Sequence, residues 1–384
     1  MTGDPYCSAL VMKIASRCNI NCSYCYMYSF EDQTYLQQPK FMSQDTVDIL
    51  LLKVKEHCLR HSLQRFFFIF HGGEPLLAKK EFFSEFVEKA RRTIDTGVKL
   101  FFSVQTNGIL LTDEWCQLFI KYNIRVGVSL DGPQAVHDKH RVDHSGKGTF
   151  LKVLEGINTL KANGLEQTAK MLCVINVDTD PIEMYEFFKS TGIRSIDFLF
   201  PDLNYECLPQ HINLATETRY ADWLIKIFDR WILDSKSTSP IQIRRFVNAI
   251  SLIMGKSTIS DEMGSENNSV LVIETDGGIE SIDSLKICGD GFTKENLNIS
   301  TNSIDDALSS NLARLYYKSH NSLCDKCNAC QVKEVCGGGH IVHRYKKSNS
   351  FDNPSIYCND LGKIYTHIRN SVYEILKKYE LVEA

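Results

Sequence analysis

Short apolar runs alternate with longer amphipathic segments over the first two thirds of the chain. The apolar runs predict strands at residues 9–16, 65–70, 98–105, 124–130, 169–176 and 195–200. Apolar residues at helical spacing predict helices near 43–60, 80–95, 112–122, 148–163, 181–190 and 216–234, and Ser43 and Thr112 stand at two of these starts as capping residues. Six β-α units in this order predict an α/β fold with parallel strands and right-handed crossovers, as in a barrel or an open part of one.

The pattern changes after residue 235. Residues 236–268 are more polar and surround one helix-like run, which indicates a bridge between domains. Residues 269–384 contain a short β-like stretch at 270–283, a cysteine-rich loop region at 324–358 and a final amphipathic helix. We therefore expect three parts, at 1–235, 236–268 and 269–384.

The composition is that of an ordinary soluble globular protein, with 43% hydrophobic and 23% charged residues in 384. A net charge of −4 gives no attraction to nucleic acid or to an anionic membrane. No apolar run has the length of a membrane span and no signal peptide precedes the first strand, so we expect a cytoplasmic protein. Disulfides are rare in that compartment, and eight of the 14 cysteines gather in two motif regions, which indicates metal binding.

The first cysteine group follows the first predicted strand. Cys18, Cys22 and Cys25 have the spacing Cys-x3-Cys-x2-Cys. Three thiolates on one loop can hold three irons of a four-iron, four-sulfur cluster, which leaves the fourth iron open for chemistry. Zinc is the alternative, although structural zinc usually takes a full set of four ligands.

Further polar residues stand at the ends of the next strands. Gly72, Gly73 and Glu74 follow the second strand, Gln105 and Asn107 end the third, Ser129 ends the fourth, and Arg141 lies downstream. Glycine-containing turns occur in any protein. In a parallel barrel, however, the chemistry lies at the carboxyl ends of the strands, so we expect these side chains to contact a cofactor or substrate.

The second cysteine group is Cys327-x2-Cys330-x5-Cys336-x21-Cys358. Four thiolates would fill every iron of a cluster and leave no open position. Such a cluster suits electron transfer or structural support. Zinc is again the alternative, because four thiolates also form a tetrahedral zinc site.

The first group, with Tyr24 just before its last cysteine, resembles the signature of the radical S-adenosylmethionine (radical SAM) enzymes. The resemblance implies a cluster on Cys18, Cys22 and Cys25 whose open iron binds SAM, and a 5′-deoxyadenosyl radical that abstracts hydrogen. It also implies SAM contacts from the strand-end residues, with Glu74 toward the amino group and Arg141 toward the carboxylate.

The carboxyl-terminal region resembles the SPASM extension of radical SAM enzymes that modify peptides. The implied fold is a partial (β/α)6 TIM barrel followed by this extension. His340 and Ile282 stand where the usual seven-cysteine pattern has cysteines. We therefore expect one auxiliary 4Fe–4S cluster, on Cys327, Cys330, Cys336 and Cys358, with Cys288 and Cys324 as irregular candidates for more.

The stretch from Cys336 to Tyr345, the stretch from Phe351 to Cys358, and residues 274–285 look like those of the cyclophane-forming radical SAM/SPASM peptide maturases. This implies a ribosomally made precursor peptide as substrate and a carbon–carbon bond between an aromatic ring and a nearby β-carbon. It also implies an electron donor such as flavodoxin or ferredoxin, and Asp283 as proton acceptor. The alternatives are a sulfatase-maturase-like oxidase, a thioether-forming maturase, and a zinc-binding peptide scaffold without activity.

Overall fold

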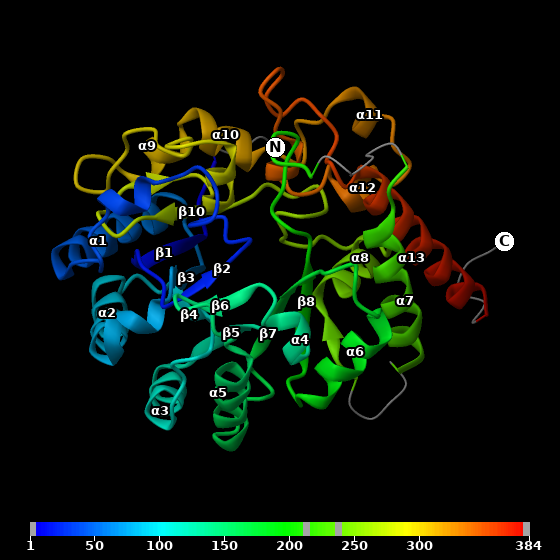
Figure 1. Cartoon of the computed structure of the whole chain (residues 1–384). Coiled ribbons are helices and arrows are strands. Elements are labelled where there is room, and N and C mark those ends of the chain that lie inside the picture. Colours follow the sequence, from blue (N-terminus) through cyan, green and yellow to red (C-terminus); the bar gives the residue numbers. More distant parts are fainter. Residues whose placement is uncertain (1–4, 210–215, 235–239, 379–384) are drawn as a thin grey trace. The chain divides into compact units, whose positions relative to one another are not determined.

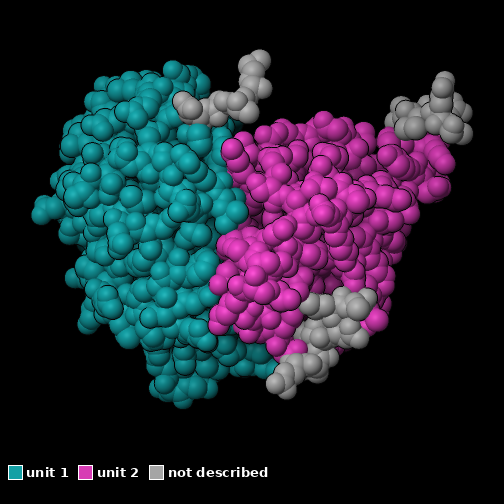
Figure 2. All heavy atoms as spheres, turned by 90° about the horizontal axis from the view of Figure 1, so that it is seen from above, with its two compact units in different colours: residues 1–172, 269–317 teal, residues 173–268, 318–384 magenta. Residues whose placement is uncertain are grey.

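The structure, a computed structural model, describes residues 5–209, 216–234 and 240–378 (Figure 1). The chain divides into two compact units, coloured teal and magenta in Figure 2. Unit 1 comprises residues 1–172 and 269–317, and unit 2 comprises residues 173–268 and 318–384. One division falls between Asn268 and Ser269, where the third predicted part begins. The three-part division itself stays a prediction, and the Ser-Lys-Ser-Thr-Ser run at 235–239 lies outside the described residues.

Unit 1 contains most of the strands and the helices between them. Its elements are β1 (Ala9–Ala15), β2 (Ile20–Cys22), η1 (Thr34–Gln37), α1 (Gln44–Arg60), β3 (Arg65–Gly72), η2 (Pro75–Ala78), α2 (Lys79–Thr93), β4 (Lys99–Thr106), α3 (Asp113–Tyr122), β5 (Ile124–Ser129), α4 (Gln134–His137), β6 (Arg141–Asp143), α5 (Phe150–Ala162), the start of β7 (Lys170–Val174), β10 (Val270–Ile273), β11 (Ile279–Glu280), η3 (Asp283–Cys288), α9 (Ile304–Leu308) and α10 (Asn311–Tyr317).

The main sheet of unit 1 has the strand order β11-β10-β1-β3-β4-β5-β7. Its strands pair in parallel except for β10 with β11, which are antiparallel. All six predicted strands are present, counting β8 in unit 2, and the predicted α/β class with parallel strands is confirmed. The sequence pattern did not indicate that β10 pairs directly with β1, which brings residues 269–317 into the same unit as the first strand.

The core of unit 1 forms where alternate residues of β3 face α2. Phe68 lies 5.3 Å from Phe86, and Phe70 lies 4.6 Å from Phe83, between ring centroids. All four side chains are fully buried. Burying a phenylalanine stabilises the folded state by about 1.5–3 kcal/mol, so this layer holds α2 on the sheet and fixes where β3 ends.

Unit 2 contains the remaining elements. They are α6 (Pro181–Ser190), β8 (Ser195–Leu199), α7 (Arg219–Asp234), β9 (Gln242–Ile243), α8 (Arg244–Ile253), α11 (Asp325–Asn328), α12 (Lys333–Cys336), η4 (Ile341–Arg344) and α13 (Cys358–Lys378). The long helix α13 packs against α7 and α8, and β8 pairs in parallel with β9. The short α11 and α12 and the turn η4 carry or adjoin the second cysteine group.

One helix cap differs from the prediction. Ser43 caps α1 as expected, because its hydroxyl accepts from the Thr46 N–H at 3.0 Å. Thr112 precedes α3, but its side chain makes no capping bond. It donates instead to the Glu114 carboxylate, which competes for the hydroxyl at this exposed position. None of the described helices is both long and apolar enough to cross a membrane.

Candidate active site

The three cysteines predicted to hold the first cluster lie on the loop after β1. All three are free thiols. The short strand β2 pairs antiparallel with β6, which sets Cys22 opposite Arg141. Burial raises the pKa of the Cys18 thiol to about 12 and that of Cys25 to about 11. Metal binding requires thiolates, so binding itself must drive their deprotonation.

Arg141 lies beside this loop and is held by Asp131. Its Nη1 is 3.7 Å from the Cys22 sulfur, and its Nε donates to Asp131 Oδ2 at 2.8 Å. Tyr24 donates its hydroxyl proton to the same oxygen, and its ring lies 5.5 Å from the guanidinium carbon. Asp131 was not among the residues predicted for the site, because it lies in an Asp-Gly-Pro sequence typical of turns. The structure shows that it orients the predicted SAM-contacting arginine.

Asn107 supplies a second donor to the loop. Its Nδ2 lies 3.8 Å from the Cys18 sulfur and donates to Asn19 Oδ1 at 2.8 Å. Donors directed at cluster thiolates tune iron–sulfur sites. Three thiols on one loop, flanked by Arg141 and Asn107, therefore fit a cluster that keeps one iron open.

Glu74 is fully buried and has several donors. Its Oε1 accepts from Leu76 N and Thr106 Oγ1 at 3.0 and 2.7 Å, and its Oε2 accepts from Asn107 N at 2.8 Å. Burial raises its pKa to about 7, although these hydrogen bonds oppose the rise. Glu74 thus ties the ends of β3 and β4 together. Its contact with the SAM amino group stays a prediction.

Gly72 and Gly73 let the end of β3 approach the start of the cysteine loop. Gly72 has φ +133°, and a Cβ there would lie 2.1 Å from the Ala15 carbonyl oxygen. Gly73 donates its N–H to that oxygen at 2.8 Å, and a Cβ on it would lie 2.3 Å from the Arg17 carbonyl oxygen. Only glycine fits at both positions. Their direct role here is this close backbone approach, and cofactor contact stays a prediction.

Gln105 and Ser129 come from the neighbouring strands β4 and β5 and pair with each other. Gln105 Nε2 donates to Ser129 Oγ at 3.0 Å. Both side chains are half-buried. The structure thus brings two of the predicted strand-end residues into contact, while their role toward a cofactor stays a prediction.

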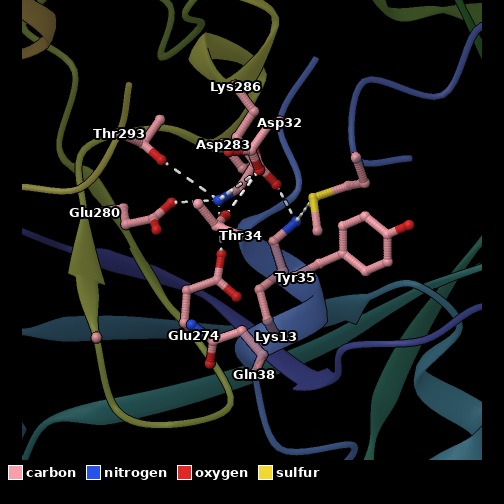
Figure 3. A network of polar contacts seen from close by, with 12 residues as sticks. Lys13, Asp32, Thr34, Tyr35, Gln38, Glu274, Glu280, Asp283, Lys286 and Thr293 are labelled. Atoms are coloured by element: carbon pink, nitrogen blue, oxygen red, sulfur yellow. Dashed lines mark hydrogen bonds and ion pairs between the residues drawn. The ribbon is translucent and has the colours of Figure 1, made fainter. Parts of the chain in front are cut away.

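Asp283 lies in a buried polar cluster with Lys13 of β1 (Figure 3) and with Tyr26, the residue that follows Cys25. The Lys13 ammonium donates to Oδ2, and the Tyr26 hydroxyl donates to the same oxygen at 2.7 Å. His71, from the adjacent strand β3, places Nδ1 3.4 Å from the Lys13 nitrogen. Burial raises the pKa of Asp283, but Lys13 and His71 outweigh it and hold the pKa well below its usual range. The carboxylate is therefore ionised near neutral pH.

A second buried network lies beside this cluster and fixes residues 274–294 (Figure 3). The Lys286 nitrogen lies 3.2 Å from Glu274, 2.9 Å from Glu280 and 3.8 Å from Asp32. All four side chains are buried. Ile282, at a position where the SPASM pattern has a cysteine, is a buried apolar side chain. Ion pairs, not thiolates, thus hold this segment in place.

The second cysteine group lies in unit 2, and Cys324, one of the two irregular candidates, lies with it. Burial raises the pKa of the Cys327 thiol to about 12. Repulsion from negative charge on the nearby Cys324, Cys336 and Cys358 adds to the rise. Burial also raises the pKa of the Cys336 thiol to about 12, and repulsion from the nearby Cys358 and Cys330 adds to this rise. The four predicted ligands therefore lie close together, and Cys324 joins them. Cys288 lies in unit 1.

The spacing of these sulfurs favours a cluster over zinc. Among the described residues, no three cysteine sulfurs lie within 4.8 Å of one another. A tetrahedral zinc site with Zn–S distances of about 2.3 Å would bring its sulfurs to about 3.8 Å. A cluster spreads its ligands further apart because each binds a different iron. The donor chemistry of both cysteine groups thus fits iron–sulfur clusters.

The turn after Cys336 depends on glycine and arginine. Gly337 has φ +57°, and a Cβ there would lie 2.0 Å from the Gly264 carbonyl oxygen. The buried Arg344 donates to the carbonyl groups of Ser319, Ser322 and Phe351 at 2.7, 2.5 and 3.1 Å. These contacts fix the loops on either side of the cysteine group.

The fold and the loop that carries Cys18, Cys22 and Cys25 together indicate the class of protein. Residues 12–188 match the family described as the radical SAM superfamily. These residues form a radical SAM domain, whose chemistry uses a 4Fe–4S cluster and S-adenosylmethionine, which supplies an organic radical when bound.

Similar proteins extend the likeness over nearly the whole chain. The Cysteine-type anaerobic sulfatase-maturating enzyme of Clostridium novyi is 28% identical over 93% of this chain and 94% of its own length. The Serine-type enzyme of Bacteroides thetaiotaomicron is 29% identical over 94% of this chain and 88% of its own length. Among solved structures, native anSMEcpe with bound AdoMet has a TM-score of 0.83 at 24% identity, covering 96% of this chain and 99% of that chain. Streptococcus suis SuiB bound to its precursor peptide SuiA has a TM-score of 0.57 at 15% identity, covering 92% and 76%. Both structures support the fold.

Lys13 and Tyr26 were not predicted from the sequence. One signal for Lys13 was available. It is the single charged residue within the apolar strand Ala-Leu-Val-Met-Lys-Ile-Ala, and a buried lysine requires a partner. Nothing in the sequence pattern identified that partner as Asp283.

Proposed function

We propose that this enzyme modifies a ribosomally made peptide by joining an aromatic ring carbon to the β-carbon of a nearby residue, closing a three-residue cyclophane. The observation that carries this proposal is the reduced set of metal ligands. Ile282 is a buried apolar side chain, and His340 pairs with Asp261 at 3.5 Å. Both stand at positions where a seven-cysteine maturase has thiolates, so we assign one auxiliary cluster.

The peptide substrate is supported by the relatives. Sulfatase-maturating enzymes and the SuiB structure with its precursor peptide are proteins that act on or bind polypeptides. We propose the same class of substrate for this chain. An electron donor such as flavodoxin or ferredoxin would supply the reducing electron.

The proposed reaction removes two hydrogens from the peptide. One leaves the β-carbon as a hydrogen atom. The other leaves the ring carbon as a proton. The auxiliary cluster that Cys327, Cys330, Cys336 and Cys358 would hold would supply the acceptor for the accompanying electron. We assign the proton to Asp283, which is ionised and buried. Its low pKa makes it a weak base, but a ring that is regaining aromaticity is a strong acid, so a weak base suffices.

Formylglycine formation is the second candidate. The relatives that are 28% and 29% identical over nearly the full length favour it. Both reactions would use the same open cysteine loop and a base in the position of Asp283. They differ in the product, since formylglycine forms at a single cysteine or serine.

The deciding experiment is anaerobic turnover of candidate precursor peptides, followed by mass spectrometry. A loss of two hydrogens that fragmentation maps to an aromatic residue and a neighbour supports the cyclophane. Deuterium placed at the β-carbon should then appear in 5′-deoxyadenosine. A change confined to one serine or cysteine supports formylglycine and would overturn the crosslink, as would a product bonded through sulfur.

A further inference from the structure

Two histidines and an aspartate of unit 2 come together outside both cysteine groups. His340, His343 and Asp202 each place one donor atom within 4.8 Å of the others. The two histidines are three residues apart across η4, and residues at this spacing in a 3₁₀ turn lie on one face. Their rings are 5.4 Å apart between centroids and inclined at 76°. The local backbone therefore directs both imidazoles to one point.

His343 is buried with one nitrogen unused. Only 5% of the residue is exposed, and its Nε2 has no hydrogen-bond partner among the residues that the structure describes. The ring bonds to the backbone of Pro201, which leaves Nδ1 as the nitrogen that makes this bond. A buried polar atom without a partner costs about 1–3 kcal/mol. Metal-binding histidines usually donate one ring N–H to a backbone carbonyl or carboxylate and bind the metal through the other nitrogen.

His340 has a carboxylate partner of the kind that orients metal ligands. Its Nε2 lies 3.5 Å from Asp261 Oδ2. Burial lowers the pKa of His340, but Asp261 and Asp202 outweigh it and raise the pKa to about 9. The same negative field that holds a proton there favours a dication. The positive charges of the nearby Arg244 and Arg245 oppose the binding of a cation. Their effect is reduced because Arg244 pairs with Asp197 and Arg245 pairs with Glu262.

We propose that Asp202, His340 and His343 bind one divalent transition-metal ion, separate from the iron–sulfur clusters. Two imidazoles and one carboxylate are the donor set of many zinc sites, and also of non-haem ferrous sites, with room for water or another ligand. The proposal is independent of the reaction proposed above. It gives His340 a ligand role at the position where the SPASM pattern has a cysteine.

Unit 1 offers a matched comparison. His57, His61 and Asp305 form a group of the same composition. There both imidazoles bond to Asp305 Oδ1, at 3.1 and 2.7 Å, and His57 Nε2 lies 3.1 Å from both the backbone N and O of Cys7. Its hydrogen bonds account for the group without an ion. It therefore serves as the control.

The test is equilibrium dialysis of the full-length, cluster-loaded protein against Zn²⁺, with iron and sulfide measured in the same samples. We expect one zinc per chain beyond the cluster metal. His343→Gln and Asp202→Asn should weaken zinc binding at least 10-fold with iron and sulfide unchanged, Asp261→Asn by about 10- to 100-fold, and His61→Gln not at all.

Two results would overturn the proposal. One is the absence of zinc binding by the unaltered protein with its iron and sulfide intact, with Fe²⁺ also failing to bind. The other is equal zinc binding by the unaltered protein, His343→Gln and Asp202→Asn. Asp202 is only partly buried, so its variant still tests the site if His343→Gln fails to fold.

Discussion

The ammonium group of Lys13 and the carboxylate of Asp283 form a buried ion pair between residues 270 positions apart in the chain. Lys13 belongs to β1 and Asp283 begins η3, so the pair joins the first strand to the segment that follows β11. A buried charge that loses its partner is strongly destabilising. The pair therefore couples the ionisation of Asp283 to the integrity of unit 1.

Lys13→Met should change how turnover depends on pH. Without the ammonium, burial dominates and the pKa of Asp283 rises, so the carboxyl group is protonated near neutral pH. Turnover of the peptide should fall about 100-fold at neutral pH and recover as pH increases. Stability should fall by about 3–5 kcal/mol, because the buried Asp283 loses the cation that pairs with it.

The control is Lys294→Met, which removes a partly exposed lysine 2.8 Å from Glu280 and should leave the pH profile as it was. The double variant Lys13→Met/Asp283→Asn should regain stability but not activity. A normal pH profile for Lys13→Met would show that Asp283 does not act as the base.

Glu74 predicts a pH dependence of stability with a definite sign. Its pKa is about 7 in the folded protein, above the ordinary value of 4.5. The folded state therefore binds more protons between these values, so this group's contribution to stability falls as pH rises from about 4.5 to 7 and is constant above. The total loss is about 3 kcal/mol at most. Thermal unfolding of the unaltered protein and of Glu74→Gln should differ in slope across this window, and equal slopes would contradict the assignment.

Removal of single cysteines should separate the two clusters. Cys22→Ala should lose the iron of the first cluster and all cleavage of SAM, because no other thiol of the loop can replace it. Cys336→Ala should lose the auxiliary iron, retain SAM cleavage and form no crosslink. Iron and sulfide analysis with SAM turnover provides the measurement, and Cys116→Ala, in the buried face of α3, is the control that should keep both clusters. Full iron content in Cys336→Ala would place the auxiliary cluster elsewhere.

Gly337→Ala should disturb the auxiliary cysteine group through the backbone alone. The new methyl group would lie 2.0 Å from the Gly264 carbonyl oxygen at a φ of +57°. We expect auxiliary iron to be lost or the melting temperature to fall, by an amount equivalent to about 2 kcal/mol or more. Gly362→Ala, within α13 and with no atom within 4 Å of the added Cβ, should be neutral or stabilising by up to about 1 kcal/mol. Similar behaviour of the two variants would contradict this account.

The sequence predicted local structure better than long-range partners. The strands and helices were predictable because their apolar residues repeat at the spacing of one element, and the cysteine groups because their spacing is short. Gln105 and Ser129 were predictable as neighbours because parallel strands bring their carboxyl ends to one edge. These signals all lie within one element or one β-α unit.

The partners of Lys13, Lys286 and Asp131 were not predictable in the same way. Lys286 meets Asp32 only because β10 joins β1, and no periodicity connects residues so far apart. Asp131 and Arg141 are only ten positions apart, yet Asp131 lies in an Asp-Gly-Pro sequence that is typical of ordinary turns. Tertiary contacts gave these residues their roles.

The parallel pairing of β1 with β10 has a consequence for how the protein is made. β1 leaves the ribosome about 260 residues before β10. Until β10 has emerged, the edge of β1 that pairs with it has no neighbouring strand. An apolar strand with an open edge is a site for aggregation. A product truncated after residue 235 should therefore be insoluble even though it retains the complete cysteine loop, and the nascent chain should depend on chaperones until β10 has been synthesised.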